Sequence, residues 1–233
     1  MRVAVTRPEA DGERSAATLR ALGHDVLLAP LMRVEPVAAD LSGTWSAIAI
    51  TSANAVATLK APRSILNLPL FAVGAHSTEA ARAAGFTDVT SADGDLRDLV
   101  RTLVARHRGQ APLLYLAGED RAADLVGALA QGGIAAQMRI VYRTVTAPFP
   151  PALVDALRDN RLDAALHYSK RSAETFIAGA RGAGLVAEAL SLRHLCLSAQ
   201  VSAPLQAAGA ATIAVAPHPD EASLIELLRT SGR

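Results

Sequence analysis

Short apolar runs alternate with longer segments of helical periodicity along the whole chain. The apolar runs predict β-strands at Val3–Val5, Val26–Ala29, Ala47–Ile50, Leu70–Val73, Leu113–Ala117 and Ala164–His167. The helical segments between them end close to glycines, the usual C-terminal stop of a helix, at Gly23, Gly85, Gly133 and Gly209. Strands that alternate with helices in this way are typical of a parallel sheet covered by helices. The pattern therefore predicts the α/β class.

A decayed internal repeat predicts how these elements are distributed. Residues 48–103 resemble residues 165–228, so that Thr51 and Ser52 after one strand align with Tyr168 and Ser169 after another. The first copy continues into a further strand and a helix, whereas the counterpart of this continuation lies at the N-terminus of the chain. Solenoid repeats are several-fold shorter, and the length suits two domains. We therefore expect two similar lobes, one of them discontinuous, each a small parallel sheet flanked by helices.

The boundaries of the lobes follow from the limits of the repeat. The discontinuous lobe comprises residues 1–34 plus 147–233, and the continuous lobe comprises residues 40–139. Residues 31–39 and 140–146 carry the chain from one lobe to the other and back, so we expect them to run side by side as a two-stranded β connector. Ligands of open α/β sheets bind beyond the carboxyl ends of the strands. This predicts a cleft between the lobes, lined by strand-to-helix turns.

Small and polar residues occupy those turns. The candidates for ligand binding are Arg7, Thr51, Ser52, Asn54, Gly74, Ser77, Ser169 and Lys170. Ser, Thr and Asn are also ordinary helix N-caps, so each turn taken alone has a local explanation. Their coincidence on one predicted face is the unusual feature. Because helix N-termini present free N–H groups and a positive dipole end, such a rim suits a carboxylate or phosphate ligand, with Arg7 and Lys170 as countercharges.

Composition narrows the class of partner. The chain is 51% hydrophobic and 19% charged with a net charge of +1, and it has no long Lys/Arg block. A nucleic acid or anionic membrane as the main partner is therefore disfavoured, whereas an anionic small molecule needs only local cations. The single cysteine, Cys196, lies in an apolar strand pattern, which excludes a disulfide framework and predicts a buried structural thiol. This cysteine usage and the lack of a secretory pattern at Met1 predict a cytoplasmic protein.

Motifs for other chemistries are missing from the sequence. No GxGxxG follows a strand and no GxxxxGK[ST] occurs, so nucleotide binding is unsupported. With one cysteine, scattered histidines and no HExxH, a metal site has little support, and we expect neither metal nor cofactor. His167 and His194 flank predicted strands and are interpreted as structural or rim residues. Glu119 and Asp120 are expected in the charged first turn of a helix.

Several motifs, taken in order, carry a family resemblance. They are the opening VTRPEADGERSAATLRALGHDVLLAPL, the turn TSANAV, the sequence AVG before a hydroxyl-bearing helix start, LYLAGED, and the connector VYRT. In order and spacing they resemble uroporphyrinogen-III synthases over nearly the whole chain. The resemblance implies a cofactor-free hydro-lyase of haem biosynthesis that cyclises hydroxymethylbilane, a linear tetrapyrrole with eight carboxylates. Water is lost and ring D is inverted to give uroporphyrinogen III.

The same resemblance suggests roles for individual residues. Tyr142 matches a tyrosine implicated in assisting departure of the substrate hydroxyl. Thr51, Ser52, Gly74, Ser77 and Ser169 match cleft positions, with Ser77 where a threonine is usual. The turn 198–202 departs from the family's glycine-started, threonine-bearing turn, which puts the substrate contacts of the second lobe in doubt. We also expect a monomer and a hand-over of substrate from the preceding pathway enzyme.

A second hypothesis comes from a different class of protein. A two-lobed protein could close on an anionic small molecule without turning it over, because no residue of the sequence is an obligatory catalyst. In that case Tyr142 is a packed tyrosine of the connector. Separation of the uroporphyrinogen isomers formed from hydroxymethylbilane distinguishes the two hypotheses.

Overall fold

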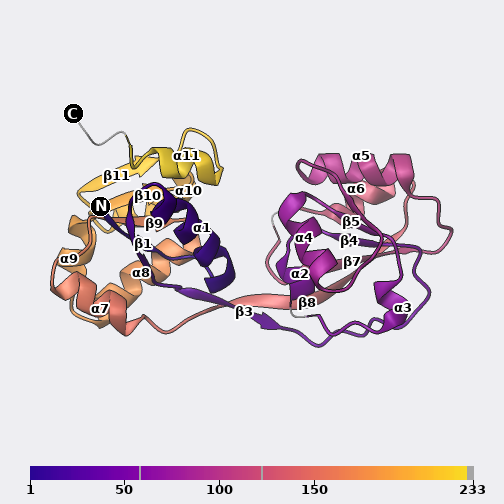
Figure 1. The fold of residues 1–233 in the computed structure, drawn as a ribbon, viewed down its shortest axis with the longest axis horizontal. Helices are drawn as coiled ribbons and strands as arrows, with labels where there is room; N and C mark the ends of the chain where they lie inside the picture. The colour runs from indigo at the N-terminus through magenta and orange to yellow at the C-terminus, as the bar shows by residue number, and fades with distance from the viewer. Residues whose placement is uncertain (58, 122, 230–233) are drawn as a thin grey trace. The chain divides into compact units, whose positions relative to one another are not determined.

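The computed structural model describes residues 1–57, 59–121 and 123–229. The chain divides into two compact units. The discontinuous unit comprises Met1–Arg33 and Val145–Arg233, and the continuous unit comprises Val34–Thr144. The N-terminal end marked in Figure 1 and the yellow segment at the other end of the described chain both belong to the discontinuous unit.

The discontinuous unit is built on a five-stranded sheet with the strand order β11-β10-β9-β1-β2. Every neighbouring pair in it is parallel. The strands are β1 (Arg2–Val5), β2 (Asp25–Leu28), β9 (Ala164–His167), β10 (Arg193–Cys196) and β11 (Thr212–Val215). The helices are α1 (Glu9–Ala21), α7 (Pro151–Arg158), α8 (Lys170–Gly182), α9 (Val186–Ser191), α10 (Ala199–Ala207) and α11 (Glu221–Glu226).

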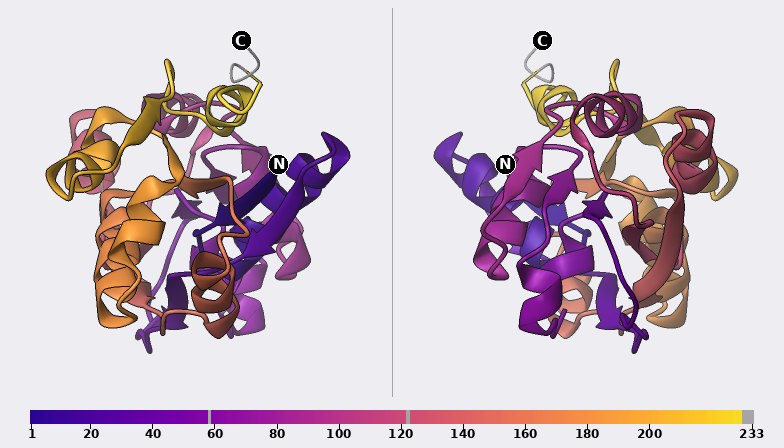
Figure 2. Two further views of the ribbon diagram at one scale, coloured as in Figure 1. Left: turned by 90° about the vertical axis from the view of Figure 1, so that its left-hand side faces the viewer. Right: turned by 90° about the vertical axis from the view of Figure 1, so that its right-hand side faces the viewer.

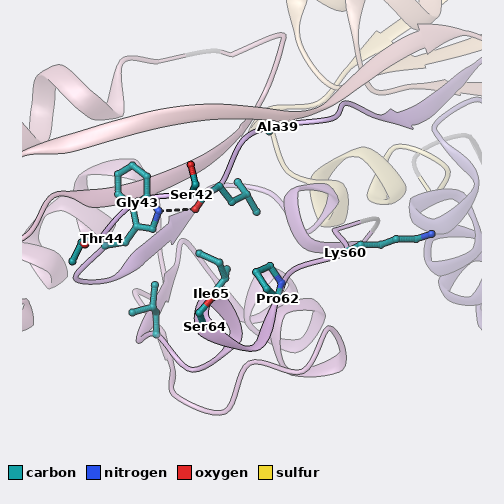
Figure 3. A pocket seen from close by; sticks show the side chains of 11 residues that line it. Ala39, Ser42, Gly43, Thr44, Lys60, Pro62, Ser64 and Ile65 are labelled. Carbon is teal, nitrogen blue, oxygen red and sulfur yellow. Dashed lines mark hydrogen bonds between the residues drawn. The ribbon is translucent and has the colours of Figure 1, made fainter.

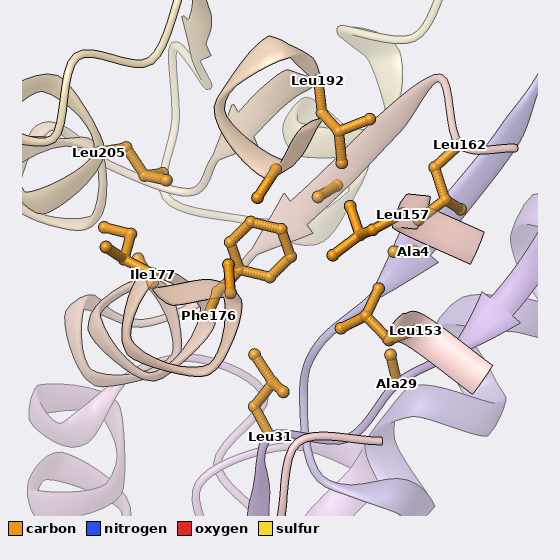
Figure 4. Close-up of a cluster of buried hydrophobic side chains, with 14 of the residues drawn as sticks. Ala4, Ala29, Leu31, Leu153, Leu157, Leu162, Phe176, Ile177, Leu192 and Leu205 are labelled. Atoms are coloured by element: carbon orange, nitrogen blue, oxygen red, sulfur yellow. The ribbon is translucent and has the colours of Figure 1, made fainter. Parts of the chain in front are cut away.

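Both faces of this sheet are buried under helices. Alternate residues of a strand point to opposite faces, so that Val3 and Val5 pack on the side of α1 and α11, whereas Ala4 packs on the side of α7 to α10. Phe176 of α8 is fully buried at the centre of the hydrophobic cluster on the Ala4 side of the sheet (Figure 4). Helices α8 and α10 pack side by side there, as the orange segments of Figure 2 show. The apolar runs at β1 and β9 are therefore interior strands of a sheet covered on both sides.

The continuous unit has a six-stranded sheet with the order β3-β8-β7-β4-β5-β6. Its strands are β3 (Met32–Pro36), β4 (Ile48–Ile50), β5 (Leu70–Ala72), β6 (Val89–Ser91), β7 (Leu113–Gly118) and β8 (Ala136–Thr146). Its helices are α2 (Asn54–Ala57), α3 (Arg63–Leu66), α4 (Ala75–Ala83), α5 (Leu96–Arg106) and α6 (Leu125–Gln131). Ile48 and Ile50 face the cluster under α2, α3 and α4, whereas Ala47 and Ala49 face the cluster under α5 and α6.

Strands that correspond in the internal repeat occupy the same places in the two sheets. The series β11-β10-β9-β1-β2 corresponds strand by strand to β6-β5-β4-β7-β8. The caps repeat as well, because Asp95 begins α5 and Asp220 begins α11 with side chains that accept backbone N–H groups. The expected helix stops Gly23, Gly85, Gly133 and Gly209 all have positive φ, the conformation that glycine adopts at least cost. These features confirm the α/β class and the helix-flanked parallel sheets.

Strands β3 and β8 are hydrogen-bonded neighbours. The N–H of Val37 donates to the carbonyl of Val141 at 2.8 Å, and the N–H of Ala147 donates to the carbonyl of Leu31 at 2.9 Å. The residue numbers increase along one segment and decrease along the other, so the two segments are antiparallel. Strand β8 begins at Ala136, however, and its first part pairs in parallel with β7. The segment 140–146 is thus the second half of one long strand.

None of the helices among residues 1–57, 59–121 and 123–229 is long and apolar enough to cross a membrane.

Candidate functional site

A cavity of about 340 Å³ opens at the carboxyl ends of β4, β5 and β7 in the continuous unit. Its lining comes from the residues that end or follow these strands, from the start of α5 and from β8: Thr51, Ser52, Val73, Leu96, Tyr115, Gly118, Asp120, Arg121, Ala123 and Tyr142. Three of the predicted site residues, Thr51, Ser52 and Tyr142, meet there. The position agrees with the rule that ligands of α/β sheets bind beyond the carboxyl strand ends.

Two hydroxyl groups are joined within the cavity. The Oγ1 atom of Thr51 lies 3.0 Å from the hydroxyl oxygen of Tyr115, and either atom can donate. Tyr115 is only 3% exposed. Sequence reasoning did not select Tyr115 as a site residue, although a hydroxyl in the middle of the apolar strand LLYLAG is a usable signal.

Ser52 lines the cavity and also binds the backbone at the start of the short helix α2. Its Oγ atom accepts the backbone N–H of Asn54 at 3.2 Å. The side chain of Asn54 is not part of the cavity lining. Ser52 therefore both makes a local backbone hydrogen bond and lines the cavity.

Tyr142 reaches the cavity from β8, the strand next to β7. Its carbonyl oxygen accepts the N–H of Glu119 at 3.0 Å. Part of its side chain packs against the buried cluster that contains Val141, so the ring is partly buried and partly presented to the cavity.

Arg121 supplies positive charge to this cavity. Its Nη1 atom donates to the carbonyl oxygens of Gly118 at 3.1 Å and Glu119 at 3.0 Å. Sequence reasoning placed Glu119 and Asp120 in the first turn of a helix, which is wrong. Helix α6 begins only at Leu125 and is capped by Asp124, whose side chain accepts the N–H of Gly127. The described residues between β7 and α6, 119–121 and 123–124, form a loop, and Arg121 binds the backbone of that loop.

Gly74 and Ser77 do not line this cavity. Gly74 is the N-cap of α4 in extended conformation, and its carbonyl accepts the hydroxyl of Thr78 at 3.0 Å. Ser77 lies inside the first turn of α4 and is only 5% exposed. A substrate role for these two residues stays a prediction.

In the discontinuous unit, Ser169 and Lys170 stand at the start of α8. Ser169 accepts the N–H of Ser172 at 3.1 Å and donates its own N–H to the Ser172 hydroxyl at 3.3 Å, which is a reciprocal capping box. The ammonium of Lys170 lies 3.7 Å from the Glu174 carboxylate, and its side chain is 62% exposed. The geometry of both residues has a local explanation, and their substrate role stays a prediction.

Arg7 is held in a polar cluster of the same unit. Its guanidinium lies 3.2 Å from Glu221 and 3.4 Å from Asp11, and its Cζ atom is 4.3 Å from the centre of the Tyr168 ring. Ser15 also donates to Glu221 and accepts from Arg7. Two carboxylates thus already compensate the charge of Arg7, which sequence reasoning treated as a countercharge for ligand.

Tyr168 belongs to the same cluster, and its hydroxyl donates to Glu221 at 3.1 Å. Burial is the main cause that raises the pKa of Tyr168 to about 12. Because desolvation disfavours the charged form, Tyr168 is a neutral donor throughout the physiological range. Neither Tyr168 nor Glu221 was selected from the sequence.

His167 and His194 form a fully buried pair. The Nε2 atom of His167 lies 3.0 Å from the Nδ1 atom of His194, and Phe176 packs edge-on against both rings. Burial lowers the pKa of His194 to about 4 and that of His167 well below its ordinary value. Both side chains are structural rather than rim residues. Cys196 is likewise buried, with its pKa raised to about 12 by burial, as expected of a structural thiol.

A second hollow, of about 620 Å³, lies among residues that precede β4 and β5 (Figure 3). Trp45 forms part of it and donates its indole N–H to the carbonyl of Leu41 at 2.9 Å. Lys60 extends away from the other labelled side chains in Figure 3. None of the predicted site residues lines it. The described residues hold no group of three or more His, Cys, Asp or Glu side chains that could bind a metal ion.

Comparison with known proteins gives the family. The family described as Uroporphyrinogen-III synthase HemD matches residues 13–226. The chain belongs to the uroporphyrinogen-III synthase family. Members of this family are enzymes of haem biosynthesis, and the function of the chain is the closure of hydroxymethylbilane to uroporphyrinogen III, with loss of water and inversion of ring D.

Solved structures of uroporphyrinogen-III synthases share the fold. The synthetase from Helicobacter pylori 26695 is 17% identical, with 99% of each chain covered and a TM-score of 0.66. A mutant synthase from the extremely thermophilic bacterium Thermus thermophilus is 20% identical, with 98% of this chain and 97% of that chain covered and a TM-score of 0.50. No curated protein sequence matches the chain.

Proposed function

We propose that the chain is a cyclising hydro-lyase whose reacting centre is the cavity at the carboxyl ends of β4, β5 and β7, with Tyr142 as the acid that assists departure of the hydroxyl. The observation that carries this proposal is the meeting of Tyr142 with Thr51 and Ser52 around one cavity. They come from strands far apart in the sequence. Strand order brings them together, because β8 and β4 both neighbour β7.

The proposed reaction needs a proton donor at one stage and a proton acceptor at a later one. A phenol is protonated at neutral pH, so Tyr142 can donate to the leaving oxygen on ring A. The carbon–oxygen bond breaks as the pyrrole nitrogen supplies its electron pair, which gives water and the azafulvene in its protonated, cationic form. The substituted carbon of ring D attacks to give a spiro intermediate. Fragmentation and reclosure invert ring D. The proton that ring D loses as it becomes aromatic again balances the proton given to the leaving hydroxyl.

The larger part of catalysis is orientation. The open substrate closes without enzyme to the uninverted isomer, so the protein must hold one geometry in preference to another, an effect worth several kcal/mol. We assign substrate contact to the hydroxyls of Thr51 and Ser52 and to the guanidinium of Arg121, since all three line the cavity. The remaining proposed substrate contacts are Arg7, Asn54, Gly74, Ser77, Ser169 and Lys170.

The decisive test supplies freshly prepared hydroxymethylbilane to the purified protein. The products are oxidised to porphyrins, and the I and III isomers are separated by chromatography. The proposal expects isomer III to predominate, whereas a control without protein gives isomer I. If only isomer I forms while the protein binds the bilane, the alternative of a binding protein without turnover takes the place of the enzyme.

Three properties stay predictions of the sequence. They are the monomeric state, the cytoplasmic location and the hand-over of substrate from the preceding enzyme of the pathway. Sedimentation velocity across a hundredfold range of concentration tests the monomeric state directly.

A further inference from the structure

The end of β7 is irregular where it faces Tyr142. Ala117 stands opposite Ile140, but the next residue, Gly118, stands opposite Tyr142, so that β8 has one residue more than β7 at this point. Such a bulge changes the direction of the side chains that follow it. Met138 and Ile140 pack against the cluster under α5 and α6, whereas Val141 and Tyr142 both pack against the opposite cluster. In a regular strand Tyr142 would lie on the same face as Ile140. The bulge instead places Tyr142 on the face of Val141.

The Tyr142 ring then lies directly over Gly118. A Cβ atom built on Gly118 would be 2.5 Å from Cζ of Tyr142, 2.7 Å from its hydroxyl oxygen and 2.9 Å from Cε2. Side-chain carbons do not approach this closely, so the ring and any side chain at position 118 exclude each other. The φ angle of Gly118 is not in the left-handed region. The glycine is therefore required by the position of the ring and not by the conformation of the backbone.

The loop after β7 fixes the backbone on both sides of this contact. The N–H of Glu119 donates to the Tyr142 carbonyl, which joins the loop to β8. Arg121 donates to the carbonyls of Gly118 and Glu119, which holds the loop in its bent course. The atoms of Gly118 closest to the phenol are thereby restrained from two directions.

We propose that Gly118 is a positioning residue for the reaction: its missing side chain sets where the Tyr142 hydroxyl stands in the cavity, with the Arg121 guanidinium holding the Gly118 backbone in place. This inference rests on the proposed function, because it acts through Tyr142. It adds a requirement that the proposed function does not contain, namely that position 118 must have no side chain.

The kinetic test uses Gly118→Ala and a matched control. The added methyl group displaces the phenol, and kcat for isomer III should fall by ~10- to 100-fold, as expected for a catalytic group moved by about 1 Å. The KM should stay within about twofold, because the hydroxyls of Thr51 and Ser52 are not touched. The control Gly182→Ala adds the same methyl group where nothing beyond the adjoining residues and the backbone of its own helix lies within 4 Å, and it should leave kcat unchanged.

A double variant separates positioning from a general loss of structure. In the Tyr142→Ala background the ring is gone, so Gly118→Ala should produce no further loss of kcat. If Gly118→Ala lowers kcat by the same factor in both backgrounds, the glycine acts independently of Tyr142 and the proposal is overturned. The double variant also has room for the methyl group, so it stays available if Gly118→Ala alone does not fold.

A spectroscopic measurement tests the contact without reference to activity. The chain has three tyrosines, so 3-fluorotyrosine labelling gives a ¹⁹F spectrum in which Tyr142 is assigned by its loss in Tyr142→Phe. Gly118→Ala should shift the Tyr142 signal and leave that of Tyr168, in the other unit, in place. An unmoved Tyr142 signal overturns the inference about Gly118. A shifted signal together with full activity of Tyr142→Phe supports the contact and instead removes the acid role from the proposed function.

Discussion

Thr51 and Tyr115 join their hydroxyl groups at 3.0 Å across the adjacent strands β4 and β7. The bond fixes the Thr51 hydroxyl at one end of the cavity by means of a side chain that is 3% exposed. The substrate contact proposed for Thr51 would therefore use a hydroxyl that is already held in place.

Tyr115→Phe removes one partner of this bond and should lower the free energy of unfolding by about 1 kcal/mol. Thr51→Val removes the other partner at constant shape. Because both variants delete the same bond, the double variant should cost less than the sum of the single variants. Urea unfolding of the four proteins measures this coupling, and strictly additive losses would show that the two hydroxyls do not depend on each other.

Tyr142→Phe keeps the ring and removes only the phenolic proton. General acid catalysis contributes ~10²- to 10⁴-fold, so kcat for isomer III should fall by about 100-fold or more while the unfolding midpoint stays the same. Isomer analysis at saturating substrate measures this. An unchanged rate would remove Tyr142 from the acid role.

Arg121→Gln removes the cation of the cavity but keeps a donor that can reach the loop carbonyls. A hydrogen bond to a charged group is worth about 1.5–3 kcal/mol, so KM should rise by about 10-fold or more with little change in kcat. Lysine cannot reproduce the two-carbonyl contact of the guanidinium, and Arg121→Lys should recover only part of the affinity. A KM equal to that of the unchanged protein in both variants would mean that no substrate carboxylate meets this side chain.

Glu221→Gln should destabilise the discontinuous unit by about 1 kcal/mol, because the half-buried Arg7 keeps only Asp11 as a carboxylate partner. The matched control is Glu226→Gln on the same helix, whose pairing with Arg229 is exposed and should contribute nothing measurable. Chemical unfolding compares the two. Equal stabilities would show that the cluster around Arg7 is no more than a surface arrangement.

The buried histidine pair predicts loss of stability in mild acid. Because the pKa of His194 in the folded state is lowered to about 4 and that of His167 is also lowered, both rings are neutral in the native state and bind protons only on unfolding. Stability is therefore complete above the unfolded pKa of about 6.5 and falls below it by up to ~1.4 kcal/mol per pH unit for each histidine. Urea unfolding between pH 7.5 and 5 measures the slope.

Replacement of both rings, as in His167→Leu with His194→Leu, should flatten this slope even if it changes stability at neutral pH. The carboxyl groups with lowered pKa, Asp40, Asp98 and Asp220, lose their contribution at lower pH than this window, since their ordinary pKa is 3.8. A slope that persists in the double variant would assign the acid sensitivity to other groups.

The sequence predicts that the two sheets resemble each other, because the correspondence between their strands is contained in the repeat. The match of Thr51–Ser52 with Tyr168–Ser169, continued into the N-terminal strand, implies the relation between the two sheets that the structure has. Apolar runs and helix-ending glycines are local signals, and they needed no knowledge of tertiary contacts.

The parts that could not be predicted depend on contacts between distant segments. The extra residue of β8 opposite Gly118 has no local signature, because the pairing register of two strands fixes it. The sequence does not predict that α6 begins as late as Leu125, because Glu119 and Asp120 resemble the charged first turn of a helix. The neutralisation of Arg7 by Glu221 spans nearly the whole chain.

The discontinuity of one unit also sets an order of events during synthesis. Strand β1 lies between β2 and β9, yet β9 begins only at Ala164. After pairing with β2, strand β1 therefore waits for its second partner while the whole of Val34–Thr144 is made. That segment contains all the helices and strands of its own sheet except the first two residues of β3 and the last two residues of β8. The unit with the candidate site can therefore close its core first, and β1 is among the last strands to gain all its neighbours.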